Sequence, residues 1–458
     1  MIVVSFISLC VLLLIGKILR ANVKLFKKLF LPSSVIAGLL GLIIVQVLSR
    51  QGGQDFVSAT TAGWSKLPGF LINIVFAALF LGVSIPKVKK IWSLAGPQLA
   101  YGQIIAWGQY AVSLGLVLLV LGKLFNISDI FAVIVPVGFE GGHGTAGGLK
   151  DTFDFFGWPA GTNLALASAT VGIISAIVVG MALVNWAIRR GYVTKVKDVN
   201  LSEMLDSSGI YAADKRPVLG FHTIKQESAE TFAVHLSLLG LAVALGFGMK
   251  QVLLQIQHVV PFLEKHSLFT GFPLFPLSMI GGLIVQSVFK RWKKMDIIDH
   301  GVMQSWAGTA LDFLIVAAVA TIRIETITQS IVPFALICLA GILWNVFCVL
   351  FLARRLLPDA WFERAIAEMG QSMGVTATGL LLLRAVDPKN ETSAPSAFAY
   401  KQLLHEPFMG GGLWTSSAIP LIIAFGSGLP VFFISLGAIF IWLVVWFFVF
   451  RKKAVAAE

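Results

Sequence analysis

The chain has 458 residues, of which 57% are hydrophobic and only 13% are charged. A water-soluble core cannot use so much apolar surface, so the composition excludes an ordinary soluble protein and predicts a polytopic, all-α membrane protein. The formal net charge of +12 does not indicate nucleic-acid binding, because the basic residues form short clusters between apolar runs and not a patch interleaved with aromatic residues.

Eleven apolar runs are long enough to cross about 30 Å of hydrocarbon. In the first half they lie at about 2–19, 33–49, 67–84, 96–121 and 158–188. In the second half they lie at about 229–257, 271–289, 302–321, 326–353 and 405–426, with one more at 429–450. The first run lacks a basic leader and a cleavage site, so we expect a retained span and not a signal peptide.

The basic clusters predict the orientation of these spans. With the N-terminus outside, all of them face the cytoplasm, as the positive-inside rule requires: they begin at Lys24, Lys87, Arg189, Lys290, Arg354 and Arg451. Five spans then precede a polar linker, so the second half starts on the opposite side from the first. We therefore expect inverted repeats at 1–188 and 229–426, a cytoplasmic linker at 189–228, and an extra transmembrane helix with a basic cytoplasmic tail at 427–458.

Two glycine-rich segments, 140–149 and 368–380, interrupt the apolar pattern. The stretches that lead into them, 127–139 and 361–368, are too short to span a membrane, which predicts re-entrant loops at about 127–157 and 361–400. Irregular backbone at membrane depth must be buried in protein or line a watery cavity. Paired broken segments at corresponding positions of two halves indicate the substrate site of a secondary transporter.

The two halves align at several positions. The glycine-rich segments pair Glu140 with Glu368, Gly142 with Gly370, His143 with Gln371, and Thr145 with Thr376 if two residues are inserted. A second match pairs 30–39 with 274–283, and a weaker one sets Asn73 beside Asp312.

The glycine-rich segments supply the candidate substrate site. Glycine lets a ligand reach backbone N–H groups, and the start of a helix attracts anions. The predicted substrate-binding residues are Gly141, Gly142, His143, Gly144, Thr145, Gly370, Gln371, Ser372, Gly374 and Thr376. Other roles remain open: the glycines can serve helix packing, the histidine and hydroxyl groups can bond to nearby carbonyl groups, and Glu140 and Glu368 can brace their loops or pair with a cation.

Asp312 is the candidate for the coupling ion, because a carboxylate in the middle of a span is costly unless it serves an ion or proton path. Its alternative is a protonated carboxyl group bonded to a neighbouring helix. Oxygen ligands suit a hard cation such as sodium. The predicted sodium ligands are Asp312, Asn73, Thr170 and Thr378.

The sequence contains no complete enzyme motif of the kinds considered, so we expect no catalytic residues. The stretch 405–409 begins like HExxH, but Met409 replaces the second histidine and Pro407 disrupts the required helix. We find no phosphate-binding GxxxxGK[ST] loop and no serine-protease nucleophile motif. Cys10, Cys338 and Cys348 lie within apolar runs and lack zinc-site spacing. We expect no cofactor other than sodium as a coupling ion.

From its first span to about Ile423, the chain resembles the sodium/glutamate symporter family. The matching residues are 141–145, 374–384 with Asp387 and Pro388, and 405–407 before Gly410, Gly411 and Gly412. The resemblance implies sodium-coupled import of L-glutamate across the cytoplasmic membrane, two inverted five-helix repeats, re-entrant loops from opposite faces, and a homodimer with an elevator-type movement. Two features depart from the family pattern: Gln371 stands where some members carry histidine, and the span at 429–450 is additional to the ten-helix plan.

Two alternatives stay open at this point. The first is a symporter for another small anion, such as a dicarboxylate or hydroxycarboxylate, or for another amino acid; related carriers for these anions share the architecture that the resemblance implies. A membrane scaffold without transport would not need midplane polar residues, so Asp312, His143 and the paired broken segments argue against it.

Overall fold

The computed structural model describes residues 2–83, 88–193, 216–225 and 227–451. Within these ranges the chain is helical and has no β-strand, and eight helices are long and apolar enough to cross a membrane. The all-α polytopic prediction is therefore confirmed. Most of the predicted linker at 189–228 and the tail after Arg451 lie outside the described residues.

The long helices account for most of the predicted spans. Two of them, α6 and α18, continue through a π-helical turn, at Val117–Leu121 and Cys348–Leu352, into the short helices α7 (Gly122–Phe125) and α19 (Ala353–Leu356). The eight long helices are α1 (Ile2–Asn22), α3 (Ser33–Arg50), α6 (Val88–Leu116), α11 (Ala160–Arg189), α13 (Thr231–Val259), α16 (His300–Ala320), α18 (Ile331–Phe347) and α24 (Leu429–Val445), which ends in a π-helical turn at Trp446–Phe450.

Three of the eleven predicted spans are shorter helices: α5 (Leu67–Ala78), α15 (Phe275–Arg291) and α23 (Leu413–Phe425). The apolar run of α5 continues beyond the helix, but the backbone turns at Gly82, where φ is +76°. Glycines bound α23, with positive φ at Gly411 before it and Gly426 after it. Glycine readily adopts positive φ, so the backbone can turn at these glycines even though apolar residues continue past them. The predicted runs of α5 and α23 are therefore longer than the helices.

The remaining helices form the two glycine-rich regions and the connections. The first region contains α8 (Ile134–Phe139) and α9 (Gly142–Gly148), and the second contains α20 (Trp361–Ser372), α21 (Thr376–Val386) and α22 (Ala394–His405). The connecting helices are α2 (Lys24–Lys28), α4 (Gln54–Trp64), α10 (Lys150–Phe155), α14 (Pro261–His266) and α17 (Ile324–Gln329).

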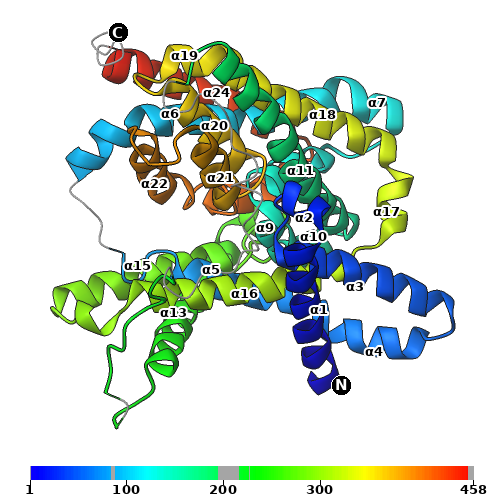
Figure 1. Cartoon of the computed structure of the whole chain (residues 1–458). Coiled ribbons are helices and arrows are strands. Elements are labelled where there is room, and N and C mark those ends of the chain that lie inside the picture. The colour runs from blue at the N-terminus through cyan, green and yellow to red at the C-terminus, as the bar shows by residue number, and fades with distance from the viewer. Residues whose placement is uncertain (1, 84–87, 194–215, 226, 452–458) are drawn as a thin grey trace.

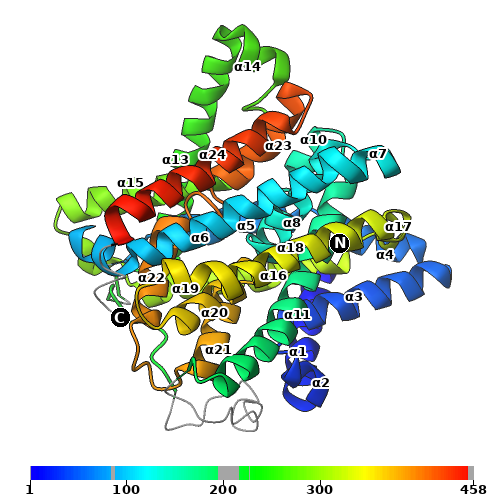
Figure 2. The same ribbon diagram turned by 90° about the horizontal axis from the view of Figure 1, so that it is seen from above.

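The helices form two groups with α9 between them (Figure 1). In the lower group of Figure 1, α5 packs against α15 and α16, while α3 packs against α1 and α16. In the upper group, α6 lies between α18 and α24 (Figure 2) and also contacts α22. Helix α9 contacts α5 and α16 on one side and α11 on the other, so it joins the two groups.

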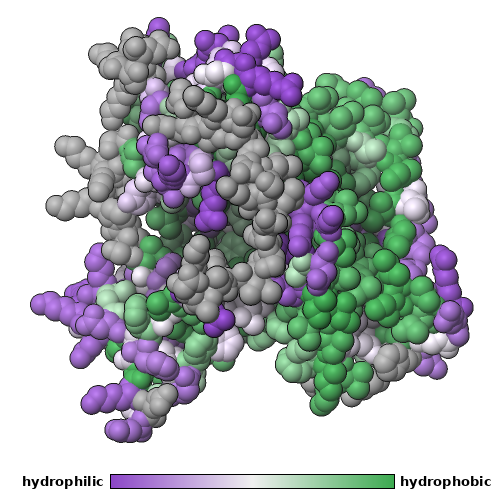
Figure 3. All heavy atoms as spheres, viewed as in Figure 1, coloured by the Kyte–Doolittle hydropathy of each residue, from purple (hydrophilic) through white to green (hydrophobic). Residues whose placement is uncertain are grey.

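The outer surface suits a lipid environment. Figure 3 shows a broad apolar face on the right of the view, with hydrophilic residues gathered at the top and lower left. Large apolar side chains are exposed on the outer helices, among them Phe6 at 60% and Phe440 at 67%. Apolar side chains that face outward from a long helix are favourable in a bilayer.

Candidate functional site

Both glycine-rich segments break a helix, as predicted. In the first, α8 ends at Phe139 and α9 begins at Gly142, whose φ of +66° is in the left-handed region. In the second, extended backbone at Val375 (φ −148°, ψ 166°) separates α20 from α21. This break follows Gly370, which stays helical and packs against α21: an added Cβ at Gly370 would lie 2.7 Å from the Cα of Gly379.

The two breaks touch each other, although they come from different halves of the chain. An added Cβ at Gly142 would lie 3.0 Å from Cγ1 of Val375. Beside this contact, the Gln371 amide Nε2 donates to Glu140 Oε1 at 3.0 Å. The sequence alignment paired Glu140 with Glu368, whereas in the structure Glu140 contacts Gln371.

A central cavity of about 520 Å³ lies where the segments meet, bounded also by α3, α5 and α16. Most of the predicted substrate residues line it: Gly141, His143, Gly144, Thr145, Gln371 and Thr376. The other four, Gly142, Gly370, Ser372 and Gly374, are not among its lining residues.

Two of the polar residues at the cavity are held by other parts of the protein. The Thr145 hydroxyl donates to the Gly410 carbonyl at 3.1 Å. The His143 Nε2 lies 2.9 Å from the Thr170 hydroxyl, which itself donates to the Leu166 carbonyl at 3.2 Å. A hydroxyl has only one proton, so His143 donates from Nε2, and its Nδ1 is then an acceptor in the neutral ring.

The four predicted sodium ligands have different surroundings, and only Asp312 lines the central cavity. Its carboxylate lies beside the Ser34 hydroxyl of α3. Asn73 occupies a related position on α5, where its Oδ1 accepts from the Ser278 hydroxyl of α15 at 3.2 Å. Thr170 bonds to His143, and Thr378 packs against Gly374 in the first turn of α21.

A buried lysine organises the polar residues behind the cavity. Lys401 on α22 is fully buried and pairs with Glu368 at 2.5 Å. Its ammonium also donates to the side-chain oxygens of Gln371, at 3.2 Å, and Gln402, at 2.9 Å. An ammonium can only donate, so both amides must turn their oxygens toward Lys401 and their N–H groups away from it.

The two amides, oriented in this way, donate toward the cavity wall. Gln371 donates to Glu140, as described above. Gln402 donates to the Thr376 hydroxyl at 2.8 Å and to Glu406 Oε1 at 3.3 Å, and Thr376 donates to Glu406 Oε1 at 3.1 Å. Lys401 thereby fixes, through the two amides, the carboxylates of Glu140 and Glu406.

The tautomer of His405 follows from its neighbours on α6. The Trp107 indole N–H donates to Gln103 Oε1 at 2.9 Å, so the Gln103 Nε2 faces His405 Nδ1, at 3.2 Å. Nδ1 must accept this bond, which places the ring proton on Nε2. From there His405 donates to Glu140 Oε1 at 2.6 Å. The imidazole in this arrangement is neutral.

Comparison with known families agrees with this architecture. The model of a family described as sodium/glutamate symporter matches residues 1–389. The chain belongs to the sodium/glutamate symporter family. It is therefore a transporter and not an enzyme. Comparison with curated proteins and with solved structures gives no match. The family match ends before α22, so Lys401, His405 and Glu406 of this symporter lie beyond the matched residues.

Lys401 and the glutamines of α6 were not predicted as functional residues from the sequence. Lys401 falls between the predicted loop at 361–400 and the predicted span at 405–426. The glutamines carried a usable signal, because polar side chains inside an apolar run are costly unless they have partners or a function. Gln98, Gln103 and Gln109 interrupt the run at 96–121, and all three are buried and bonded to other residues.

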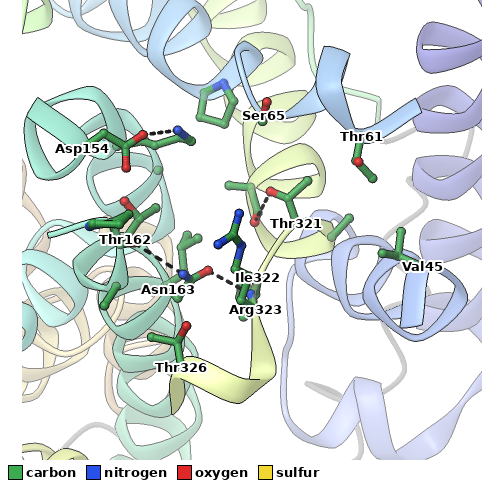
Figure 4. A pocket seen from close by; sticks show the side chains of 18 of the residues that line it. Val45, Thr61, Ser65, Asp154, Thr162, Asn163, Thr321, Ile322, Arg323 and Thr326 are labelled. Atoms are coloured by element: carbon green, nitrogen blue, oxygen red, sulfur yellow. Dashed lines mark hydrogen bonds and ion pairs between the residues drawn. The ribbon is translucent and has the colours of Figure 1, made fainter. Parts of the chain in front are cut away.

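The symporter has a second cavity, of about 870 Å³, at the other end of α9. Gly147 lines this cavity, whereas Gly144 lines the central one. Figure 4 shows Arg323 extending into the space, with Asn163 and Thr162 of α11 on one side and Thr321 on the other. The Asn163 oxygen accepts from the Arg323 backbone N–H at 2.9 Å. Helix α9 thus has a cavity at each end.

Proposed function

We propose that this symporter imports L-glutamate with sodium across the cytoplasmic membrane. The observation that carries the proposal is the central cavity between the two glycine-rich segments. Val375, Thr376 and Ala377 at the start of α21 line it, and no side chain caps that helix. Backbone N–H groups and the helix dipole favour an anion at such a start, so we assign the substrate carboxylates to α21.

Repeated geometry supports two inverted repeats, at 1–188 and 229–426. Helix α5 packs against α15 and α16, and α16 packs against α3 and α5. Asn73 meets Ser278 across the first of these contacts, and Asp312 meets Ser34 across the other. A π-helical turn precedes each predicted re-entrant loop. Because five spans separate corresponding elements, the loops at 127–157 and 361–400 would enter from opposite faces.

The two cavities at the ends of α9 support alternating access. Between them α9 fits closely against its neighbours: an added Cβ would lie 2.9 Å from Leu311 at Gly144 and 2.7 Å from Ile72 at Gly148. Because glycine has no side chain, α9 lies close to the lower helix group at these positions. No bulky α9 side chain there would prevent the upper group from sliding along the lower group. We further propose that the symporter is a homodimer with its N-terminus outside. Its transport domain would move across the membrane in an elevator-type movement.

Uptake into vesicles tests the function directly. Purified protein in proteoliposomes should accumulate labelled L-glutamate when sodium is higher outside, and should not do so with equal sodium or with potassium in its place. Accumulation that ignores the sodium gradient would contradict the coupling, and accumulation of no glutamate would contradict the substrate.

The orientation of the repeats predicts opposite labelling at two exposed positions. Lys123 follows the fourth predicted span, and Lys389 follows the second glycine-rich region. Single cysteines at these sites, in a background with Cys10→Ser, should react with an impermeant reagent from opposite sides of the membrane. Cys338 and Cys348 are buried and should stay unreactive. Labelling of both sites from the same side would contradict inverted repeats.

Asp312 should act on sodium and not directly on glutamate, because a carboxylate attracts the cation and repels the anionic substrate. Asp312→Asn should raise the sodium concentration for half-maximal uptake while leaving glutamate affinity nearly unchanged at saturating sodium. Weaker sodium binding lowers apparent glutamate affinity only when sodium is limiting. Normal sodium dependence with reduced glutamate affinity at every sodium concentration would remove Asp312 from the ion site.

A further inference from the structure

Glu140 and Glu406 give one wall of the central cavity uncompensated negative charge. Both residues line the cavity, and their carboxylates lie close enough to repel each other. The buried cation behind them, Lys401, is ion-paired with Glu368. Its ammonium also donates to the two amide oxygens of Gln371 and Gln402. Lys401 is not among the residues that line the cavity, so it orients this wall from behind.

The other donors to these carboxylates are neutral. His405 donates to Glu140 as a neutral imidazole, because its Nδ1 accepts from Gln103. The remaining bonds come from the Gln371 and Gln402 amides and the Thr376 hydroxyl. Neutral donors satisfy lone pairs but do not cancel a formal charge. A cationic ligand group would cancel it.

Glu140 also has an unused acceptor. Its side chain is only 2% exposed, and its bonds to His405 and Gln371 both end on Oε1. Among the described residues, Oε2 has no hydrogen-bond partner. A buried acceptor without a partner is destabilising, so a ligand that brings N–H donors to this wall would gain binding energy from it.

We propose that Glu140 and Glu406 bind the α-ammonium group of the substrate, which makes the symporter selective for amino acids over dicarboxylates of equal length. This inference rests on the proposed function, in which the substrate carboxylates face α21. An ammonium brings one positive charge and three donors, which match Glu140 Oε2 and the Glu406 carboxylate. The cavity volume of about 520 Å³ suits a small organic molecule and far exceeds the volume of a bare ion.

Competition between L-glutamate and glutarate tests the proposal, because glutarate keeps both carboxylates but lacks the ammonium group. In uptake assays with sodium higher outside the vesicles, glutarate should inhibit glutamate uptake by the wild-type protein at least about 100-fold more weakly than unlabelled L-glutamate does. In the variants Glu140→Gln and Glu406→Gln, the glutamate concentration for half-maximal uptake should rise about tenfold or more. Inhibition by glutarate should not weaken in these variants. The selectivity ratio, which is the inhibitory concentration of glutarate divided by that of L-glutamate, should therefore decrease.

The controls separate an effect on the ammonium from effects on charge and folding. Asp129→Asn removes a carboxylate that bonds to the Gly428 N–H at 2.7 Å, outside the central cavity, and should keep the wild-type ratio. Thermal unfolding in detergent shows whether each variant is folded. Glu406 is only partly buried, so Glu406→Gln carries the test if Glu140→Gln does not fold.

Three results would overturn the proposal. Variants with the wild-type selectivity ratio would show that neither carboxylate recognises the ammonium. Variants that raise the sodium requirement at saturating glutamate, with unchanged selectivity, would assign the carboxylates to sodium. Wild-type vesicles that accept glutarate as well as glutamate would remove the selectivity itself. A wild-type protein without sodium-dependent glutamate uptake would instead contradict the proposed function.

Discussion

Lys401→Met should be among the most destabilising single substitutions in this protein. The change leaves Glu368 fully buried without its ion-pair partner, and loss of one partner of a buried pair costs about 3–5 kcal/mol. It also frees the amides of Gln371 and Gln402, which lose the donor that orients them. We expect a large decrease in the thermal unfolding temperature in detergent and loss of glutamate uptake.

The double variant Lys401→Met/Glu368→Gln separates these two effects. Removing both charges should recover much of the stability, because a buried pair contributes less than the cost of breaking it. Uptake should stay low, since neither substituted residue can orient Gln371 and Gln402. Lys389→Met, at an exposed position, controls for the loss of one positive charge. A double variant no more stable than the single one would contradict the role of the ion pair.

Gly142→Val should abolish uptake through a local effect at the meeting of the two broken segments. The residue has φ of +66°, and an added Cβ would already lie 3.0 Å from Val375. A side chain in the left-handed region costs about 1–2 kcal/mol, and the valine methyl groups would also push against the start of α21. The expected result is a folded protein with glutamate uptake at background.

Gly157→Val is the matched control, because Gly157 has a similar φ of +74° but an added Cβ there meets nothing within 4 Å. It carries the same backbone strain without the contact to the second segment. We expect Gly142→Val to lose at least as much stability in thermal unfolding as Gly157→Val, with uptake lost only in Gly142→Val. If both variants retained the same glutamate uptake, well above background, the contact between the segments would not be needed for transport.

The sequence was sufficient for the long helices and for the two interruptions, because both are local signals. A run of about 20 apolar residues specifies a span, and the glycines that interrupt it stand next to one another in the chain. The length of α5 was not predictable from composition, since apolar residues continue past Ala78 while the backbone turns near Gly82.

The network around Lys401 depends on contacts that no local pattern encodes. Lys401 pairs with Glu368 across two helices, and its importance appears only when α20, α22 and α6 are packed together. The second break illustrates the same limit. The alignment placed equivalent residues at Glu140 and Glu368, but helix packing of Gly370 against Gly379 moves the break to Val375 and brings Gln371 to Glu140.

Under the proposed function, the charge of the central cavity also implies the order in which the ligands bind. Glu140, Asp312 and Glu406 line it, and none of its described lining residues is lysine or arginine. A glutamate anion that enters the empty carrier therefore meets repulsion that its single ammonium only partly offsets. Sodium bound beside Asp312 relieves that repulsion, so under the proposed function sodium enters first. A carrier holding glutamate alone would be scarce, and substrate could not leak back without its cation.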